Sequence, residues 1–500
     1  MDPEITLLDD GFGYNTRFPE TAEPWGSPVG AGSATTWTSA LDASFANCIR
    51  YPGGTVANFW GAQQDKLFSK KASHNPSGWI DVNKVGFDII TNAVNADAQQ
   101  VNSLADLKKA YNTGVSVLFV MNLVTPGKDF YASAEGWNRT INDHPGTSGQ
   151  NDDWYKMLDA RYEKSKQMLI KAQQQGITVK YIEIGNEVYL ANATYYAEVF
   201  SAYGGRSAGE NYAIAANYIA NKLKNDPDLT NRNNFIFSVP GAAEKVDFTS
   251  SRILDWNSQM VPSLNTDLFD YITLHSYQEA DLTIDNFTAA NVKSNISTWL
   301  DNMNQTFTDK STYSYILNTD KKWRVWWNEL GITQKSAAVE KKWGAILAQV
   351  FAALWSLEKK GALYMQPNLN NTNVVDPNTG AIKGKGYAFI PLMQASRDNI
   401  KARKLKFPGS PTLGPGGRTV LQGYLFSNAS GGNKKACIIN LSDQPIAVDL
   451  SDAFPGMAQL AISGEKSADP NNAGDPDHVS YHTNPSNNVT LDAYSVNLVR

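Results

Sequence analysis

The stretch "VKYIEIGNE", residues 179–187, joins an apolar run to a polar ending, and it decides both the fold class and where to look for chemistry. The run up to Ile184 is typical of a buried strand. It ends on Gly185, Asn186 and Glu187. A carboxylate directly after a buried strand is either a hydrogen-bonded structural acid or a group placed for catalysis.

Seven further apolar runs have a similar length and character. They are "GFGYN" (11–15), "NCIRYPGG" (47–54), "VSVLFVMNLV" (115–124), "FIFSVPGAA" (235–243), "FDYITLHSY" (269–277), "RVWWNELGI" (324–332) and "ALYMQPNL" (362–369). Helical patterns separate most of them, including residues 152–176, which end on the helix-stopping Gly176. Eight strands that alternate with helices predict a parallel sheet closed into a (β/α)8 TIM barrel.

The composition and the hydrophobic periodicity of the sequence change near residue 405. A Pro/Gly-rich linker (406–417) is followed by short alternating runs with turn residues between them and no helical pattern. These features are typical of a small antiparallel β-sandwich. We therefore predict a catalytic barrel over residues 1–404 and a β-sandwich domain over 405–500, with a long loop at 464–487.

The bulk composition excludes several classes of protein. The net charge of −5 argues against a nucleic-acid partner, and no apolar run is long enough for a membrane span. The two cysteines, Cys48 and Cys437, fall in different predicted domains, which excludes a disulfide scaffold and a cysteine-based zinc site. No H-E-x-x-H pattern is present, so we expect neither a metal nor another cofactor.

The beginning, "MDPEITLLDD", lacks the basic and apolar segments of a signal peptide. We expect a secreted or periplasmic protein from which the signal is already removed, and a cytoplasmic location stays open. The oligomeric state does not follow from the sequence.

The residues that close the predicted strands point to a catalytic site. In a barrel of this kind, active sites lie at the carboxyl ends of the strands. Strand four ends on Asn186 and Glu187, and strand seven ends on Asn328 and Glu329. Two carboxylates that face each other across a barrel mouth are the working groups of glycoside hydrolysis, one as the acid and the other as the nucleophile.

Strand alternation predicts which side chains accompany the two glutamates. Arg50 closes strand two, His275 and Tyr277 share one face of strand six, and Trp327 shares the face of Glu329. An arginine and a tyrosine hydroxyl beside one carboxylate would hold it ionised, while a carboxylate in a less stabilising setting keeps its proton.

These observations assign a role to each glutamate. Glu329 is the expected nucleophile because Arg50 and Tyr277 can stabilise its charge. Glu187 is the expected acid/base because no cationic neighbour is evident for it. Asn186 is expected to face the 2-hydroxyl of a bound sugar.

Structural roles compete with several of these assignments. Glu183 lies deeper on the face of Glu187 and favours a hydrogen-bonded structural role. Arg50 is either part of the site or a structural ion-pair partner, and His275 and Tyr277 are either site residues or packing residues. Trp327 either packs in the core or contacts substrate. Trp60 and Tyr189 are candidate platforms for the CH face of a sugar, and each could equally be a packing residue.

The motifs together resemble those of the clan A glycoside hydrolases. "IEIGNE" (182–187) looks like the strand-four signature, in which the Glu is the acid/base, and "VWWNELGI" (325–332) fits the strand-seven nucleophile. "IRYPGGTVANFW" (49–60) and "LHSY" (274–277) are similar to segments of the arabinofuranosidase-like and heparanase-like branches, where the Arg lies beside the nucleophile and the Tyr bonds to it. A barrel followed by a β-sandwich is also their arrangement.

The sequence therefore predicts a retaining glycoside hydrolase that cleaves a polysaccharide or oligosaccharide by double displacement with two glutamates. Carbohydrate is the expected partner. One alternative is a non-catalytic carbohydrate-binding protein on a decayed barrel. Another is a barrel enzyme of a different reaction type, such as a metal-dependent hydrolase, although the lack of histidine ligand clusters in the sequence counts against it. The sugar, the linkage and the choice between exo and endo action stay open.

Overall fold

The structure of the chain is a computed structural model, which describes most parts of the sequence. They are residues 3–17, 35–58, 60–61, 66–68, 79–80, 104–123, 152–190, 200, 205–242, 250–279, 290–318, 323–333, 342–368, 374–376, 379, 381–414, 417–454, 460–464, 478–482 and 488–500.

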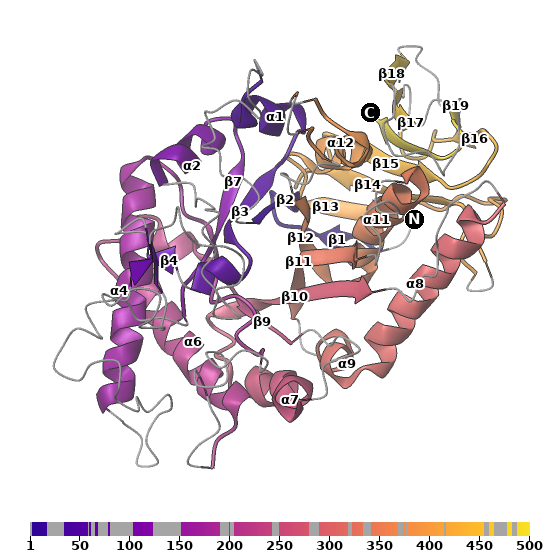
Figure 1. Cartoon of the computed structure of the whole chain (residues 1–500). Helices are drawn as coiled ribbons and strands as arrows, with labels where there is room; N and C mark the ends of the chain where they lie inside the picture. Colours follow the sequence, from indigo (N-terminus) through magenta and orange to yellow (C-terminus); the bar gives the residue numbers. More distant parts are fainter. Residues whose placement is uncertain are drawn as a thin grey trace.

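Eight parallel strands close into a barrel in the order in which they occur along the chain (Figure 1). They are β2 (Phe12–Arg17), β3 (Cys48–Gly53), β7 (Ser116–Val120), β8 (Tyr181–Glu183), β9 (Ile236–Pro240), β10 (Phe269–Glu279), β11 (Arg324–Thr333) and β12 (Gly361–Asn368). Each of them overlaps one of the eight apolar runs of the sequence. The predicted (β/α)8 barrel is confirmed.

Helices follow the barrel strands and form the outer layer. They are α1 (Trp37–Ala43), α2 (Leu104–Tyr111), α4 (Asp152–Gln174), α6 (Ala208–Asn225), α7 (Ser251–Met260), α8 (Val292–Asp309), α9 (Ser311–Leu317), α11 (Trp343–Ser356) and α12 (Gly384–Ser396). The helix α4 ends just before Gly176, whose φ of 73° is the left-handed conformation that stops a helix. The sequence predicted this stop.

Side chains fill the interior of the barrel. Cys48, Leu118, Val120, Tyr181 and Trp326 belong to one buried cluster. The ring of Trp326 lies 6.0 Å from that of Tyr181, edge to face. Because the barrel is a packed core and not a channel, a ligand has access at its ends, where the strands give way to loops.

A seven-stranded antiparallel sheet follows the barrel, with the order β1-β13-β14-β15-β20-β17-β18. Its strands are β1 (Ile5–Thr6), β13 (Lys401–Lys404), β14 (Leu421–Ser427), β15 (Lys435–Asn440), β17 (Leu460–Gly464), β18 (His478–His482) and β20 (Ser495–Val499). A separate pair, β16 (Ile446–Asp449) and β19 (Asn488–Leu491), completes the second domain.

Two details of this sheet differ from the sequence interpretation. The predicted long loop at 464–487 contains β18, which pairs with β17, so the loop prediction was wrong for residues 478–482. The sheet also takes β1 and β13 from the range 1–404. The domain boundary at residue 405 stays a prediction, and this strand pairing is a reason to move it before β13.

The second domain packs directly on the barrel. The helix α12 contacts barrel strand β2 on one side and β14, β15 and β20 on the other. The indole Nε1 of Trp343, on α11, donates to the carbonyl of Tyr494 at 2.6 Å. Figure 1 shows β14 and β15 of this domain, in light orange, beside α12 and α11, with the later strands in yellow.

Two smaller observations complete the fold. A three-stranded sheet of β4 (Trp60–Gly61), β5 (Lys66–Phe68) and β6 (Trp79–Ile80) follows β3. Of the helices in the described part of the chain, none has the length and apolar character that a membrane crossing requires.

Candidate active site

The end of β8 places Glu187 at the mouth of the barrel through an unusual backbone. Gly185 has a φ of 91° and Glu187 a φ of 45°, both in the left-handed region. Asn58 holds the turn between them: its Nδ2 donates to the carbonyl of Asn186 at 2.5 Å, and its Oδ1 accepts from the amide of Asn186 at 3.1 Å. The left-handed conformation costs a glutamate about 1–3 kcal/mol, and such strain gathers at functional sites.

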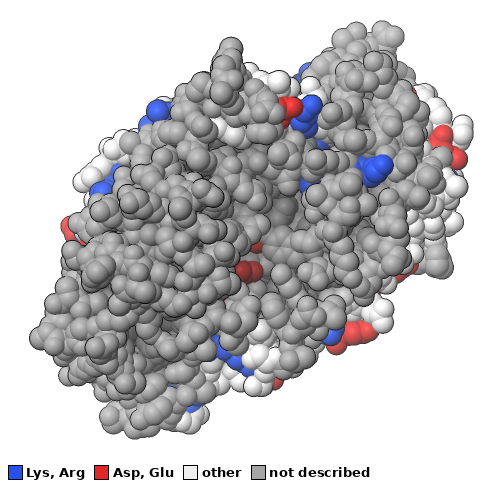
Figure 2. Space-filling model, viewed as in Figure 1, with Lys and Arg blue, Asp and Glu red and all other residues white. Residues whose placement is uncertain are grey.

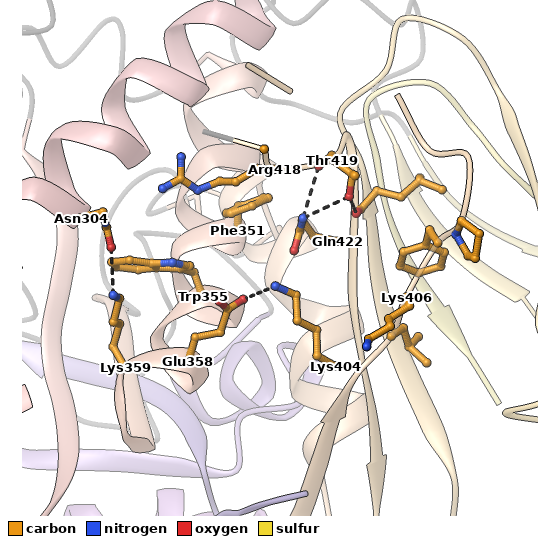
Figure 3. A pocket seen from close by; sticks show the side chains of 15 residues that line it. Asn304, Phe351, Trp355, Glu358, Lys359, Lys404, Lys406, Arg418, Thr419 and Gln422 are labelled. Atoms are coloured by element: carbon orange, nitrogen blue, oxygen red, sulfur yellow. Dashed lines mark hydrogen bonds and ion pairs between the residues drawn. The ribbon is translucent and has the colours of Figure 1, made fainter. Parts of the chain in front are cut away.

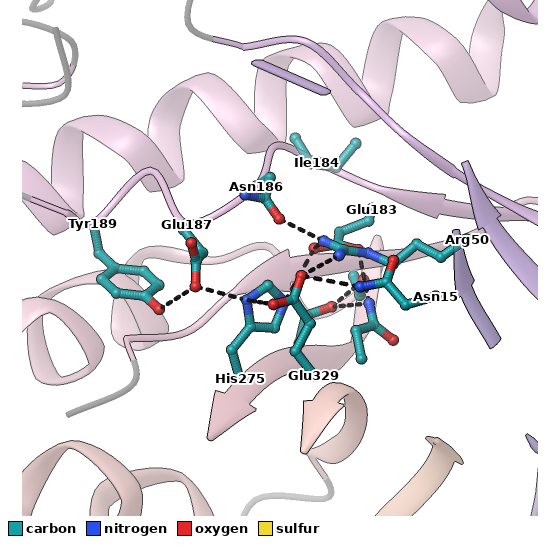
Figure 4. Close-up of polar contacts among 12 residues, drawn as sticks. Asn15, Arg50, Glu183, Ile184, Asn186, Glu187, Tyr189, His275 and Glu329 are labelled. Carbon is teal, nitrogen blue, oxygen red and sulfur yellow. Dashed lines mark hydrogen bonds and ion pairs between the residues drawn. The ribbon is translucent and has the colours of Figure 1, made fainter. Parts of the chain in front are cut away.

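Arg50, from β3, lies at the centre of the cluster and is fully buried (Figure 4). Its Nε and Nη2 donate to the two carboxylate oxygens of Glu183 at 2.8 and 2.9 Å. Its Nη1 donates to Oε1 of Glu329 at 2.7 Å, and its Nη2 also donates to Oδ1 of Asn186 at 2.6 Å. One guanidinium therefore links the ends of strands β3, β8 and β11.

The environment keeps this guanidinium charged. Burial by itself would lower the pKa of Arg50, but the charges of Glu183 and then of Glu329, together with their hydrogen bonds, raise it above its ordinary value. Glu329, whose side chain is 8% exposed, also accepts from Nδ2 of Asn15 at 3.3 Å. A fixed positive charge and an amide donor thus both stabilise an ionised Glu329.

Glu183 occupies the structural position that the sequence favoured. Its side chain is fully buried. Besides the bidentate contact with Arg50, its Oε2 accepts from Nδ2 of Asn328 at 2.7 Å. Both of its oxygens are engaged below the mouth, so Glu183 is not placed to meet a ligand.

Glu187 has a neighbour that the sequence interpretation did not foresee. Nδ1 of His275, on β10, lies 2.9 Å from Oε1 of Glu187, and the hydroxyl of Tyr189 donates to the same oxygen at 3.4 Å. The expectation that Glu187 has no cationic neighbour was therefore wrong. Burial alone would lower the pKa of His275, but the charge of Glu329 and the hydrogen bond and charge of Glu187 together raise it.

The two glutamates and the histidine form a compact group. One carboxylate oxygen each of Glu187 and Glu329 and one ring nitrogen of His275 all lie within 4.8 Å of one another. Figure 2 shows acidic side chains, in red, at the floor of a hollow in this face of the molecule. These three atoms also offer a ligand set that a divalent cation could use, so the expected absence of a metal stays a prediction.

Trp327 does not join the group, and the prediction that it shares the face of Glu329 was wrong. Its ring packs against Phe307 of α8 at 5.1 Å, and its Nε1 donates to the carbonyl of Lys359 at 3.3 Å. The cause is a bulge in β11, where Leu274 pairs with Trp327 but His275 pairs with Glu329. The skipped residue, Asn328, and Glu329 can therefore both reach the site.

Three further predicted residues have different outcomes. Tyr277 lies in β10 and Trp60 in β4, but their side chains are outside the described residues, so both roles stay predictions. Tyr189 is 1% exposed and packs near Trp256. It is therefore not a sugar platform, and its hydroxyl supports Glu187.

Three asparagines of the site, Asn15, Asn58 and Asn328, had no role predicted from the sequence. Two of them carried a usable signal: Asn15 ends the first apolar run, and Asn328 precedes Glu329 as Asn186 precedes Glu187. Asn58 lies in a short 3-10 helix after β3, and no pattern in the sequence distinguishes it.

A second cavity, of about 630 Å³, lies between the barrel helices and the second domain (Figure 3). Two of its charged groups have partners within the lining: Lys404 contacts Glu358 at 2.6 Å, and Lys359 donates to Asn304 at 2.9 Å. None of the residues that line it belongs to the group around Arg50. The candidate active site is therefore the cluster at the barrel mouth.

Comparison with known proteins identifies the architecture. The sequence matches no protein-family model and no curated protein. A family 51 alpha-L-arabinofuranosidase from Bifidobacterium longum superposes with a TM-score of 0.62 at 15% identity, over 100% of this chain and 97% of that one.

Two further structures give the same result. A GH51 arabinofuranosidase from Xanthomonas axonopodis pv. citri matches with a TM-score of 0.57 at 14% identity, over 100% of this chain and 97% of that one. An alpha-L-arabinofuranosidase from Thermotoga maritima in complex with arabinose matches with a TM-score of 0.55 at 13% identity, over 99% of this chain and 97% of that one. At these identities the likeness establishes the fold, a TIM barrel with a C-terminal β-sandwich, and confirms the predicted resemblance at that level.

Proposed function

We propose that this chain is a retaining glycoside hydrolase that uses Glu187 and Glu329. The observation that carries the proposal is that one carboxylate oxygen of Glu187 lies within 4.8 Å of one carboxylate oxygen of Glu329 at the mouth of the barrel. Retaining enzymes hold their two carboxyl groups about 5–5.5 Å apart, whereas inverting enzymes need about 6.5–9.5 Å to admit a water molecule. The observed approach supports double displacement.

Glu329 acts as the nucleophile in this proposal. Arg50 at 2.7 Å and Asn15 at 3.3 Å stabilise its negative charge. Its carboxylate attacks the anomeric carbon, the glycosidic C–O bond breaks, and a covalent glycosyl-enzyme forms. Water then displaces Glu329 and restores the original anomeric configuration.

Glu187 acts as the general acid and then as the general base. It gives its proton to the departing oxygen in the first step and takes a proton from the attacking water in the second. His275 and Tyr189 both contact its Oε1. Within the described structure, Oε2 is then the oxygen that has no partner, and it can face the leaving group.

Asn186 supplies the contact expected for the sugar. Its Oδ1 is engaged by Arg50, which fixes the orientation of the amide. Its Nδ2 is buried and has no hydrogen-bond partner among the described residues. A sugar hydroxyl that accepts from this nitrogen would satisfy it, and such a contact strengthens catalysis when it tightens in the transition state.

The architecture suggests where a substrate search should begin. The similar structures reported above are described as arabinofuranosidases, two of them as alpha-L-arabinofuranosidases, so 4-nitrophenyl α-L-arabinofuranoside is the first substrate to test. A polysaccharide substrate would require action outside the cytoplasm, and a secreted or periplasmic location is part of this proposal.

The test is a panel of 4-nitrophenyl glycosides and plant, algal and microbial glycans, with NMR to identify the first anomer released. We expect turnover of at least one glycoside with a product of retained configuration. A product of inverted configuration would exclude double displacement. Saturable binding of an oligosaccharide without any hydrolysis would favour the carbohydrate-binding alternative instead.

A further inference from the structure

One arginine of a neighbouring helix donates hydrogen bonds to the backbone of the segment that follows Glu187. Arg252, on α7, donates from Nη2 to the carbonyl of Val188 at 2.9 Å and from Nε to the carbonyl of Tyr189 at 3.2 Å. Its Nη1 donates to the carbonyl of Phe200 at 3.0 Å. A single planar guanidinium therefore holds the chain at residues on both sides of segment 191–199.

Arg252 itself is held in place by its surroundings. Its guanidinium carbon lies 5.2 Å from the ring of Trp256, one turn further along α7. The same indole ring packs against Tyr212 of α6 at 5.2 Å and against Tyr189 at 6.4 Å. Arg252 therefore extends from α7, and the ring against which it lies is packed in turn against α6.

The electrostatics of Arg252 are unusual for a structural arginine. Burial lowers its pKa to about 10, and none of the carboxylates in the described part of the chain is positioned to raise it. Among the described residues its donors all go to backbone carbonyls. A charge buried without an acidic partner costs free energy, so this arrangement calls for a compensating role.

The backbone at Glu187 needs such support. Its φ of 45° is strained for a glutamate and persists where the surroundings determine it. Asn58 fixes the preceding residue, Asn186, by hydrogen bonds to both its amide and its carbonyl. Arg252 fixes the two residues after it, and the amide of Leu190 closes the turn on the carbonyl of Glu187 at 3.0 Å.

We propose that Arg252 is a positioning residue that aims the Glu187 carboxyl at the leaving-group oxygen. This inference rests on the proposed function. Arg252 contacts the backbone that follows Glu187 and leaves the carboxyl itself to His275 and Tyr189. Its loss should therefore disturb proton donation more than binding or nucleophilic attack.

The test is the leaving-group dependence of kcat/KM in Arg252→Met, with the sugar that the glycoside panel identifies. Proton donation by a general acid contributes about 10²–10⁴-fold, and a good leaving group needs little of it. We expect kcat/KM to fall about 10–100-fold for the phenyl glycoside, because a misaimed acid loses part of that contribution. For the 2,4-dinitrophenyl glycoside we expect a loss below about threefold, since its departure needs little protonation.

Arg324→Met is the matched control. Arg324, on β11, also has a pKa lowered by burial and donates to a backbone carbonyl, that of Gly361, at 2.9 Å. Arg324 begins β11, and the next residue, Val325, pairs with Gly361 at the beginning of β12, so this arginine lies at the opposite end of the barrel from Glu187. The control should lose thermal stability, with the same loss of kcat/KM on both glycosides.

Arg252→Lys keeps the charge but can reach fewer of the three carbonyls, so it should show the same selective loss in a milder form. An equal loss on both glycosides in Arg252→Met, or in Arg252→Lys if the methionine variant does not fold, would overturn the proposal. The proposed function fails by a different result, which is the absence of retaining turnover in the unaltered protein.

Discussion

The two ends of the barrel accommodate carboxylates in opposite ways. At the end where the strands begin, Asp10 accepts from the hydroxyls of Ser116 at 2.7 Å and Tyr181 at 3.1 Å, and burial raises its pKa. Nearby, Lys180 and Asp9 form a solvent-exposed ion pair at 2.5 Å. At this end of the barrel, uncharged hydroxyl donors and a solvent-exposed ion pair are the partners of the carboxylates.

At the other end, three glutamates crowd around one arginine and one histidine. Glu183 and Glu329 share Arg50, while Glu187 contacts His275. Crowding of like charges destabilises a fold, and perturbed groups of this kind gather at functional sites. We infer that one end of the barrel is arranged for stability and the other for the proposed chemistry, and four predictions test that difference.

Glu329→Ala should have the largest effect. Without a nucleophile the covalent intermediate cannot form, so kcat on the preferred 4-nitrophenyl glycoside should fall by about 10⁴-fold or more. Asp10→Asn, at the stable end, should leave kcat near that of the unaltered protein. A comparable loss of kcat in both variants would erase the functional difference between the two ends.

Arg50→Met should have the largest effect on stability. It leaves Glu183 and Glu329 buried without their common cation, which should lower the free energy of unfolding by about 3–5 kcal/mol. Lys180→Met removes an exposed ion pair and should cost about 0–1 kcal/mol. Urea denaturation of both variants measures the two decreases in the free energy of unfolding. Decreases of similar size would contradict the prediction.

Glu187→Ala should reduce kcat less than Glu329→Ala and should respond to an added nucleophile. Its glycosylation step survives with a good leaving group, but the base for the second step is missing, so kcat should fall by about 10²-fold with an initial burst. Azide should restore the rate and give a glycosyl azide of retained configuration. If azide instead rescued Glu329→Ala to a retained product, the two roles would have to be exchanged.

His275→Gln should have the smallest effect, a change in how stability depends on pH. The folded-state pKa of His275 is raised above 6.5, so its contribution to stability is complete below pH 6.5 and is lost as the pH rises through the folded value. The stability difference between the unaltered protein and His275→Gln should therefore shrink as pH increases above 6.5, as measured by thermal denaturation.

Tyr313→Phe provides the control for this last prediction. Its hydroxyl donates to the carbonyl of His275 at 3.1 Å, so the variant disturbs the same residue without removing the imidazole. Its stability difference from the unaltered protein should be constant over the same pH range. A His275→Gln difference that is equally constant would show that the imidazole carries no linked proton.

Local sequence patterns are enough to predict much of the fold. The eight apolar runs became the eight barrel strands because each is bounded by turn or helix residues. The polar residues at their ends, Arg50, Asn186, Glu187, His275 and Glu329, lie together because parallel strands of a closed barrel end at one rim. Strand periodicity and strand order therefore suffice to assemble most of the candidate site.

Strict alternation failed where the strand geometry departs from regularity. Trp327 and Glu329 lie on different faces because the bulge at Asn328 shifts the pairing of β11 by one residue and brings Glu329 opposite His275. A bulge depends on pairing with the neighbouring strand, and no residue pattern within "VWWNELGI" predicts it.

Residues 179–187 and the other strand ends thus determined by themselves the barrel, its rim and the two candidate glutamates. The tertiary structure alone decided the distances that make a mechanism: the 4.8 Å grouping of Glu187, His275 and Glu329, and the support from Asn58 and Arg252. The physical reason is that local periodicity sets which way a side chain points, whereas separations across a barrel depend on how all eight strands close.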